Sequence, residues 1–400
     1  MRIGVVKETR EGERRVALVP DAVKRLTDRE GHEIVVEAGA GLGANHLDES
    51  YEQAGATLAS DGSAWDAEVV LKVAAPTEQE IGRLSEGQVL VGFLSPLTDG
   101  DTAKALADAG VTAFAVEAIP RTTRAQAMDA LSSQANIGGY AAVLLASTQL
   151  GRFFPMLTTA AGTIAPAKVL VLGAGVAGLQ AIATAKRLGA VVTGFDVRGE
   201  VAEQVQSLGA KFLEIDVSGG EGEGGYAREL DADQQELIKQ GVSDAAVRSD
   251  VVITTAQIPG RPAPKLVSEQ AVKDMNPGAI IVDLAGESGG NTDLTQGGKT
   301  VVEHDVKIVS ELNLPSSMSQ HASQLYAQNM VNLLALFTGD DEDDSTLRLD
   351  FTDDIVEAAC LTHGGGVVHG RAAEAAGVEK AELPSSEPAG SASTSGEESE

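Results

Sequence analysis

The sequence predicts an α/β protein of two domains, each built on a parallel sheet. Two observations carry this prediction. Short apolar runs alternate with segments of helical periodicity along most of the 400 residues, which is the pattern of parallel strands joined by helices. The stretch 168–198 also places a glycine-rich turn and an Ala-rich amphipathic segment between two apolar runs. That is the order of a strand–helix–strand unit. A chain of this length can bury two cores of ordinary size.

The first domain is expected over residues 1–135 and is completed near the end of the chain by residues 338–381. Its predicted helices are Asp21–Arg29 and Thr102–Ala109, which have helical apolar periodicity. One long helix is predicted over Ala125–Thr148, where the chain leaves this domain. The strands are predicted at five short apolar runs: Met1–Val6, Glu33–Glu37, Val69–Val73, Gln88–Phe93 and Val111–Ala115.

The second domain is expected over residues 136–337 and begins with the unit Lys168–Arg198. Here Gly173, Gly175 and Gly178 follow an apolar run with the spacing of a dinucleotide-binding turn. The first glycine permits the bend, the second lets backbone approach a pyrophosphate, and the third lets helix pack on strand. The N-terminus of the helix offers N–H groups and a positive dipole end to the phosphates. The turn, including Ala174 and Val176, is therefore predicted to bind a dinucleotide; a glycine-rich turn without a ligand is the alternative.

Asp196 ends the second apolar run of this unit, where a carboxylate can accept hydrogen bonds from both ribose hydroxyls. A 2′-phosphate would meet its negative charge, so the site is expected to prefer NAD(H) to NADP(H).

The remainder of the second domain supplies four further predicted strands and a closing helix, Ser319–Phe337. The strands are Lys211–Glu214, Val251–Thr254, Ala279–Leu284 and Lys307–Val309. A glycine-rich loop lies at Ser218–Gly225. Residues 346–370 are expected to return to the first domain. Residues 382–400 are rich in Ser, Gly and Glu, without an aromatic residue, so a disordered acidic tail is predicted.

The composition limits the partners and the setting. The formal net charge is −29, from 59 acidic and 30 basic side chains, which disfavours nucleic acid or an anionic lipid surface as a partner. Such acidity is tolerated where salt screens repulsion, so a halophilic source is expected. The single cysteine, Cys360, excludes a disulfide framework and a cysteine metal cluster, and no metal is predicted. Because the N-terminus is charged and no long apolar run occurs, the chain is expected to be cytoplasmic.

The segment Pro120–Tyr140 holds a second candidate site. Gln126, Asp129 and Ser132 are spaced three residues apart, so on a helix they would share one face, and Arg121 lies just before them. An amide, a carboxylate, a hydroxyl and a guanidinium together could hold a carboxamide-bearing ring. The alternative is a capped, solvated helix start in which Asp129 pairs with Arg124 or Arg121.

Several of these segments, in order, resemble the NAD(H)-binding subunit of proton-translocating nicotinamide nucleotide transhydrogenase, a relative of alanine dehydrogenase. The matching pieces include KETREGERRVALVP, RAQAMDALSSQANIGGY, KVLVLGAGVAGLQAIATAKRLGA, TTAQIPGRPAPKLV and MNPGAIIVDLAGESGGN. The resemblance extends to about residue 370. It implies two Rossmann-like domains joined by two long helices, with the cofactor in the cleft between them, and a homodimer.

The same resemblance implies roles for individual residues. Arg121, Gln126, Asp129 and Ser132 would lie at the nicotinamide end, with Gln126 and Asp129 orienting the ring for catalysis. Gly173–Gly178, Asp196, Val197 and Arg198 would hold the pyrophosphate and the adenosine end. Gly225 and Gln257 are weaker assignments, because the loop varies in length and leucine is usual at position 257. The NADP(H)-binding and membrane-embedded components would be separate chains that hold this one at the inner face of the cell membrane.

Two alternatives remain open. In alanine dehydrogenase, Arg15 and Lys72 would bind the substrate, but its catalytic histidine position is occupied here by Ser95. Reduction of an imine or carbonyl needs a proton donor that titrates near neutral pH, which serine is not. Hydride transfer between nicotinamides needs orientation and exclusion of water instead. The other alternative is a non-catalytic NAD(H)-sensing subunit of a membrane complex.

Overall fold

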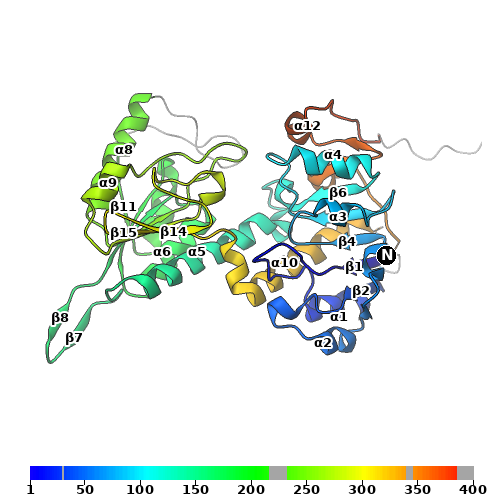
Figure 1. The fold of residues 1–400 in the computed structure, drawn as a ribbon, viewed down its shortest axis with the longest axis horizontal. Coiled ribbons are helices and arrows are strands. Elements are labelled where there is room, and N and C mark those ends of the chain that lie inside the picture. Colours follow the sequence, from blue (N-terminus) through cyan, green and yellow to red (C-terminus); the bar gives the residue numbers. More distant parts are fainter. Residues whose placement is uncertain (29–30, 216–231, 339–345, 385–400) are drawn as a thin grey trace, which may run out of the picture.

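The computed structural model describes residues 1–28, 31–215, 232–338 and 346–384. Figure 1 shows two α/β units side by side, with two long helices, α5 (Ala130–Gln149) and α10 (Ser319–Leu334), between them. The loop predicted at Ser218–Gly225 and most of the predicted acidic tail lie outside the described residues. Within the described residues, no helix is long and apolar enough to cross a membrane.

The first unit is built on an eight-stranded sheet with the order β17-β16-β6-β5-β4-β1-β2-β3. Its six N-terminal strands run parallel, and β16 and β17 add antiparallel at one edge. Fully buried parallel strands need apolar residues on both faces, and β4 and β5 are buried throughout. The strands are β1 (Arg2–Val5), β2 (Glu33–Glu37), β3 (Thr57–Ala59), β4 (Val69–Leu71), β5 (Val89–Gly92), β6 (Thr112–Ala115), β16 (Cys360–His363) and β17 (Gly366–Val367).

Six helices of the described residues flank this sheet, and two hydrophobic clusters cover its faces. The helices are α1 (Pro20–Asp28), α2 (Asp48–Gln53), α3 (Glu78–Ile81), α4 (Gly100–Asp108), α11 (Asp354–Ala359) and α12 (Gly370–Ala376).

The second unit is built on a seven-stranded sheet with the order β11-β10-β9-β12-β13-β15-β14. The strands are β9 (Lys168–Leu172), β10 (Val191–Phe195), β11 (Lys211–Phe212), β12 (Val251–Thr254), β13 (Ile280–Asp283), β14 (Lys299–Glu303) and β15 (Val306–Ser310). Among the strands that the structure describes in this sheet, only β14 pairs antiparallel. The helices are α6 (Val176–Arg187), α7 (Ala202–Ser207), α8 (Ala232–Val247) and α9 (Glu269–Asp274).

Helix α5 fixes the second unit by very close packing on α6. A Cβ added at Gly139 of α5 would lie 2.1 Å from the Ala177 carbonyl oxygen of α6. Only a glycine lets the two backbones approach this closely. Beyond the C-terminal end of α5, a separate hairpin of β7 (Leu157–Thr159) and β8 (Gly162–Ile164) projects from this unit (Figure 1).

The strand predictions are largely confirmed, whereas three other expectations need correction. The sheets are not wholly parallel, because β14, β16 and β17 run antiparallel. The helix predicted from Ala125 begins at Ala130, because Asp129 caps it. The helix predicted to Phe337 ends at Leu334 and continues as a 3₁₀ turn. The sequence patterns did not predict α2, α3, α7, α8, α9, α11, α12, β3, β14, β16, β17 or the β7–β8 hairpin.

Candidate nucleotide-binding cleft

A cleft of about 1610 Å³ opens between the two units and is lined by both. The whole chain has 59 acidic against 30 basic residues, but the lining is nearly balanced. Its basic residues are Arg10, Arg15, Arg121, Arg198, Lys239, Arg261, Lys265 and Arg371, and its acidic residues are Glu11, Glu13, Glu117, Asp196, Glu236, Glu287 and Glu311. The cleft is therefore far better suited to an anion than the rest of this acidic protein.

The glycine turn between β9 and α6 has the geometry that its sequence predicts. Gly173 has φ +94°, and a Cβ at Gly178 would lie 1.8 Å from the Gly173 carbonyl oxygen. A Cβ at Gly175 would have no neighbour within 4 Å, so this glycine borders open space. Gly175, Val176 and Ala177 line the cleft, whereas Ala174 is buried. The N-terminus of α6 is thus presented to the cleft, as a phosphate site requires.

Asp196 follows β10 and links the glycine turn to Arg198. Its carboxylate accepts hydrogen bonds from the N–H of Ala174 at 2.7 Å and from the N–H and Nε of Arg198, both at 2.9 Å. The Asp196 side chain is 7% exposed and still lines the cleft, with Val197 and Arg198 beside it. Because Arg198 is paired with Asp196, its positive charge is already compensated.

The segment around Asp129 differs from the predicted single helical face. Asp129 is the N-cap of α5 and accepts hydrogen bonds from the Ser132 N–H at 2.8 Å and from its Oγ at 2.6 Å. Gln126 begins a separate 3₁₀ turn, Gln126–Met128, and its side chain is exposed. Arg121 and Ser132 line the cleft, but Gln126 and Asp129 do not. The capped helix start is therefore confirmed, although Arg124 pairs with Asp353 and Asp354 rather than with Asp129.

The two cations discussed for alanine dehydrogenase pair with carboxylates of the first unit, and Arg15 also donates to Gln134 Oε1 of α5 at 2.9 Å and to Asn313 Oδ1, after β15, at 3.0 Å. Arg15 lines the cleft and pairs with Glu13, with 2.7 Å between Nη2 and Oε2. Burial alone would raise the pKa of Glu13, but the hydrogen bonds and charge of Arg15 outweigh it and lower that pKa to about 2. Lys72 is 1% exposed, lies outside the lining and pairs with Glu8 and Glu80 at 3.3 and 3.1 Å.

Other residues of the cleft were not predicted or lie beyond the described structure. Gln257 lines the cleft and donates its Nε2 to the Leu284 carbonyl at 2.9 Å, whereas Gly225 lies outside the described residues. Glu117 was not predicted; it follows β6 at the carboxyl edge of the sheet, where a polar residue after a buried strand is a usable signal. Arg371 and His369 of the lining were also missed. His369 caps α12, its Nδ1 accepting from the Ala372 N–H at 3.3 Å.

The comparisons with known proteins agree with this geometry. Residues 4–138 match the family model of the N-terminal domain of alanine dehydrogenase/PNT, and residues 142–370 match that of the C-terminal domain. The chain is 46% identical over 379 residues to an NAD(P) transhydrogenase alpha-subunit chain of Rhodospirillum rubrum, covering 92% of this chain and 98% of the relative. It is 34% identical over 330 residues to the alanine dehydrogenase of Mycobacterium tuberculosis, covering 80% and 82%.

The solved structures rank these two groups in the same order. The transhydrogenase of Sinorhizobium meliloti superposes with a TM-score of 0.84 at 44% identity, covering 92% of this chain and all of that one. An L-alanine dehydrogenase superposes with a TM-score of 0.78 at 27% identity, covering 94% and 99%. The chain belongs to the alanine dehydrogenase/PNT family, on the branch of the NAD(P) transhydrogenase alpha subunits.

Proposed function

We propose that this chain is the NAD(H)-binding component of a proton-translocating NAD(P) transhydrogenase. When bound, NADH supplies a hydride from its nicotinamide C4 to NADP⁺ on another chain, which leaves NAD⁺ and NADPH. One observation carries the proposal: the glycine turn, with Gly173 at φ +94° and Gly178 closing on it, presents the α6 N-terminus to a cleft whose opposite wall holds Arg121 and Arg15.

The residues of the second unit would bind the pyrophosphate and the adenosine end. The backbone around Gly175 has open space in front of it, and the first N–H groups of α6 supply donors for phosphate oxygens. Asp196 and Arg198 would meet the ribose. A 2′-phosphate would bring negative charge against the Asp196 carboxylate, while Arg198 is already engaged by it. We therefore expect NADH to bind more tightly than NADPH.

The first unit and α5 would orient the nicotinamide ring. Arg121 and Ser132 face the cleft, and Asp129 fixes the Ser132 hydroxyl through a 2.6 Å hydrogen bond. The catalytic role expected for Asp129 thus becomes an indirect one. Gln126 would have to turn from solvent toward the cleft to reach the ring. Four apolar side chains exposed in the cleft offer surfaces for flat rings: Leu131, Val176, Ile258 and Leu312.

Hydride transfer between two nicotinamides needs no proton donor or acceptor from this chain. Ser95, which is exposed in the cleft, stands where alanine dehydrogenase would need its histidine. His369 does line the cleft, but its Nδ1 is engaged in capping α12, and burial, then Arg371 and Lys380, lower its pKa. The alternative of a non-catalytic NAD(H)-sensing subunit is distinguished from the transhydrogenase component by an assay of hydride transfer.

The proposed partners are separate chains that hold NADP(H) and span the membrane. The name of the Rhodospirillum rubrum relative describes it as one portion of a divided alpha subunit, which supports a division of the enzyme among polypeptides. The chain would then lie on the cytoplasmic face of the cell membrane through those partners. The net charge of −29 supports a halophilic source.

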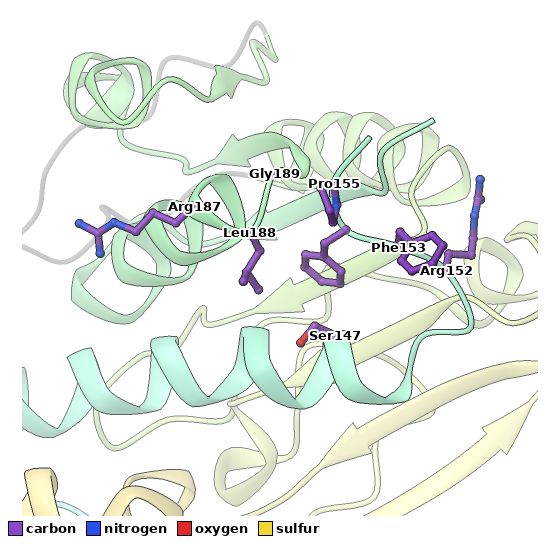
Figure 2. A pocket seen from close by; sticks show the side chains of 8 residues that line it. Ser147, Arg152, Phe153, Pro155, Arg187, Leu188 and Gly189 are labelled. Atoms are coloured by element: carbon purple, nitrogen blue, oxygen red, sulfur yellow. The ribbon is translucent and has the colours of Figure 1, made fainter. Parts of the chain in front are cut away.

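A homodimer is proposed from the surface around the β7–β8 hairpin. Near this hairpin, Phe153 is 51% exposed and Met156 64% exposed. A shallow pocket of about 520 Å³ lies between the ends of α5 and α6 at the hairpin base (Figure 2). Exposed apolar side chains beside a projecting hairpin suit a second copy of the chain. Phe153→Ser with Met156→Ser should shift sedimentation toward monomer, whereas Val302→Ser, equally exposed on β14, should not.

The central test mixes the purified chain with an NADP(H)-binding component and follows hydride transfer to an NAD analogue. We expect transfer that requires both proteins, and calorimetry should show NADH binding more tightly than NADPH. NADH binding without any transfer would favour the sensor, and equal affinities for the two nucleotides would contradict the assignment of Asp196.

A further inference from the structure

The turn that follows β5 holds Ser95 in an unusual backbone conformation. Ser95 has φ +52°, in the left-handed region that L residues rarely adopt. The other non-glycine residues with positive φ in the described structure are Asn45, His304, Asp305 and Asn313, which belong to the types most often found there. Ser95 does not, and it also precedes Pro96, a position with further steric restriction. Inside the turn, the Ser95 carbonyl oxygen accepts hydrogen bonds from the N–H groups of Thr98 at 3.0 Å and Asp99 at 2.9 Å.

The carboxyl group of the half-buried Glu117 adds hydrogen bonds to this turn from outside it. Its Oε1 accepts hydrogen bonds from the N–H groups of Leu94 at 2.9 Å and Ser95 at 2.5 Å. Glu117 lies in the 3₁₀ turn Val116–Ala118, directly after β6. Strands β5 and β6 are parallel neighbours with Gly92 opposite Ala115, so the two segments leave the sheet at the same edge. One carboxyl oxygen therefore joins the segments that follow two adjacent strands.

The second carboxyl oxygen of Glu117 indicates that this link between the two segments has a role beyond folding. Oε2 is buried and has no hydrogen-bond partner among the described residues. Burying an unpartnered carboxyl oxygen is unfavourable, and such groups in folded proteins need a reason beyond packing. Glu117 also lines the cleft, where a residue that destabilises the fold can be retained for function.

The Ser95 turn touches the second unit across the cleft. A Cβ added at Gly260, in the loop after β12, would lie 3.2 Å from Leu97 Cβ and 3.2 Å from Arg371 Nη2. Arg371 also donates Nη2 to the Pro259 carbonyl oxygen at 3.5 Å. Leu97 and Arg371 thus form the first unit's side of a contact that spans the cleft. Downstream of Glu117, the same segment leads to Arg121, which faces the proposed nicotinamide position.

We propose that Glu117 is a positioning residue for hydride transfer, which holds the Ser95 turn so that Leu97 meets Gly260 and the two walls of the cleft keep their separation. The inference rests on the proposed function. The glycine turn lies on one wall of the cleft and Arg121 lies on the other. The separation of the two walls therefore decides how Arg121 can orient the nicotinamide of a dinucleotide bound at the glycine turn. A displacement of about 1 Å between reacting groups can change a rate by on the order of 100-fold.

The test compares three changes in the full chain, reconstituted with the NADP(H)-binding component. Glu117→Ala removes the acceptor and should lower transfer at least tenfold while NADH affinity changes by less than about threefold, because most binding contacts lie on the other wall. Glu117→Gln keeps an oxygen for the two N–H groups and should retain most of the rate. Adding Ser95→Gly to Glu117→Ala should recover part of the rate, since glycine adopts positive φ without being held. Glu52→Gln on α2, an exposed glutamate outside the cleft, is the matched control.

Leu97→Ala keeps the test decisive if Glu117→Ala fails to fold, because it removes the Leu97 Cδ1 that would lie 3.7 Å from a Cβ at Gly260 and leaves the Glu117 carboxyl in place. It should lower transfer in the same direction, with an unchanged melting temperature. Wild-type transfer per folded molecule in both Glu117→Ala and Leu97→Ala would overturn the inference, as would the absence of any recovery by Ser95→Gly. Failure of the wild-type protein to transfer hydride would instead reject the proposed function itself.

Discussion

The glycine turn yields the sharpest prediction, because its third glycine leaves no space for a side chain. A Cβ at Gly178 would lie 1.8 Å from the Gly173 carbonyl oxygen, whereas ordinary contact begins at 3.4 Å. The obstacle is backbone at both ends, so it cannot rotate away. Alanine in a helix gains about 0.5–1 kcal/mol over glycine, but forcing backbone apart in a packed region costs about 1–3 kcal/mol or more. We expect Gly178→Ala to lower the free energy of unfolding by about 2 kcal/mol.

Gly175→Ala is the matched control, because its Cβ would meet nothing within 4 Å. Gly175 precedes α6 with φ −76° and ψ −167°, which any residue can adopt, so stability should change by less than about 1 kcal/mol. Its methyl group would occupy the space through which a pyrophosphate approaches the backbone. We expect NADH affinity to fall at least about tenfold, which corresponds to about 1.4 kcal/mol.

Denaturant unfolding and calorimetric titration of NADH on the same preparations separate the two effects. In a unit of about 200 residues, a loss of about 2 kcal/mol should lower the melting temperature by roughly 4–8 °C. The reasoning is refuted if Gly178→Ala is as stable as wild type, or if Gly175→Ala binds NADH with unchanged affinity.

Three further predictions concern single side chains. Asp129→Asn keeps an oxygen for the cap of α5 but places an NH₂ donor beside the Ser132 hydroxyl; melting temperature and NADH affinity should stay near wild type, while transfer falls at least about tenfold, and unchanged transfer would remove Ser132 from the site. Burial raises the pKa of Glu117 from 4.5 to about 7, so its contribution to stability is present at low pH and lost as pH rises through 7. Denaturant titrations should therefore show that the free energy of unfolding of Glu117→Gln, relative to wild type, rises by up to about 3 kcal/mol between pH 5 and 8. Parallel pH curves for the two proteins would contradict this. Purified chain with L-alanine and NAD⁺ should show no NADH absorbance, because Ser95 replaces the acid–base group; steady alanine-dependent reduction would reverse the ranking.

The strands were predictable because burial on both faces requires a short run of apolar residues, which can be seen in the sequence. β12 is buried at all four positions, and β2 carries the buried apolar run Ile34–Val36 between two glutamates, since a strand covered by helices on both sides needs apolar residues where it is buried. The β7–β8 hairpin has no such run. It lies at the surface, and its residues Thr158, Thr159 and Thr163 are polar and exposed.

The start of α5 shows why a periodic pattern misplaced a site. Gln126, Asp129 and Ser132 have helical spacing, but Asp129 accepts the Ser132 N–H and so occupies the cap instead of the first turn. Aspartate favours the cap because its carboxylate satisfies an N–H that has no partner inside the helix. A face calculated through the cap places Gln126 beside Ser132, whereas the structure turns it to solvent.

The two walls of the cleft differ in how far apart in the sequence their parts lie. The glycine turn and Asp196 belong to one strand–helix–strand unit, so spacing alone is enough to identify them, and the 2.7 Å bond from Ala174 N–H to Asp196 confirms their contact. The opposite wall combines Ser95, Glu117 and Arg371, which come from three separate segments of the chain, and it meets Gly260 of the second unit. Their contacts depend on the order of β5 and β6 and on the approach of the two units, neither of which any local motif encodes. A dinucleotide site can therefore be recognised from one wall, but the geometry that would govern hydride transfer is set by both.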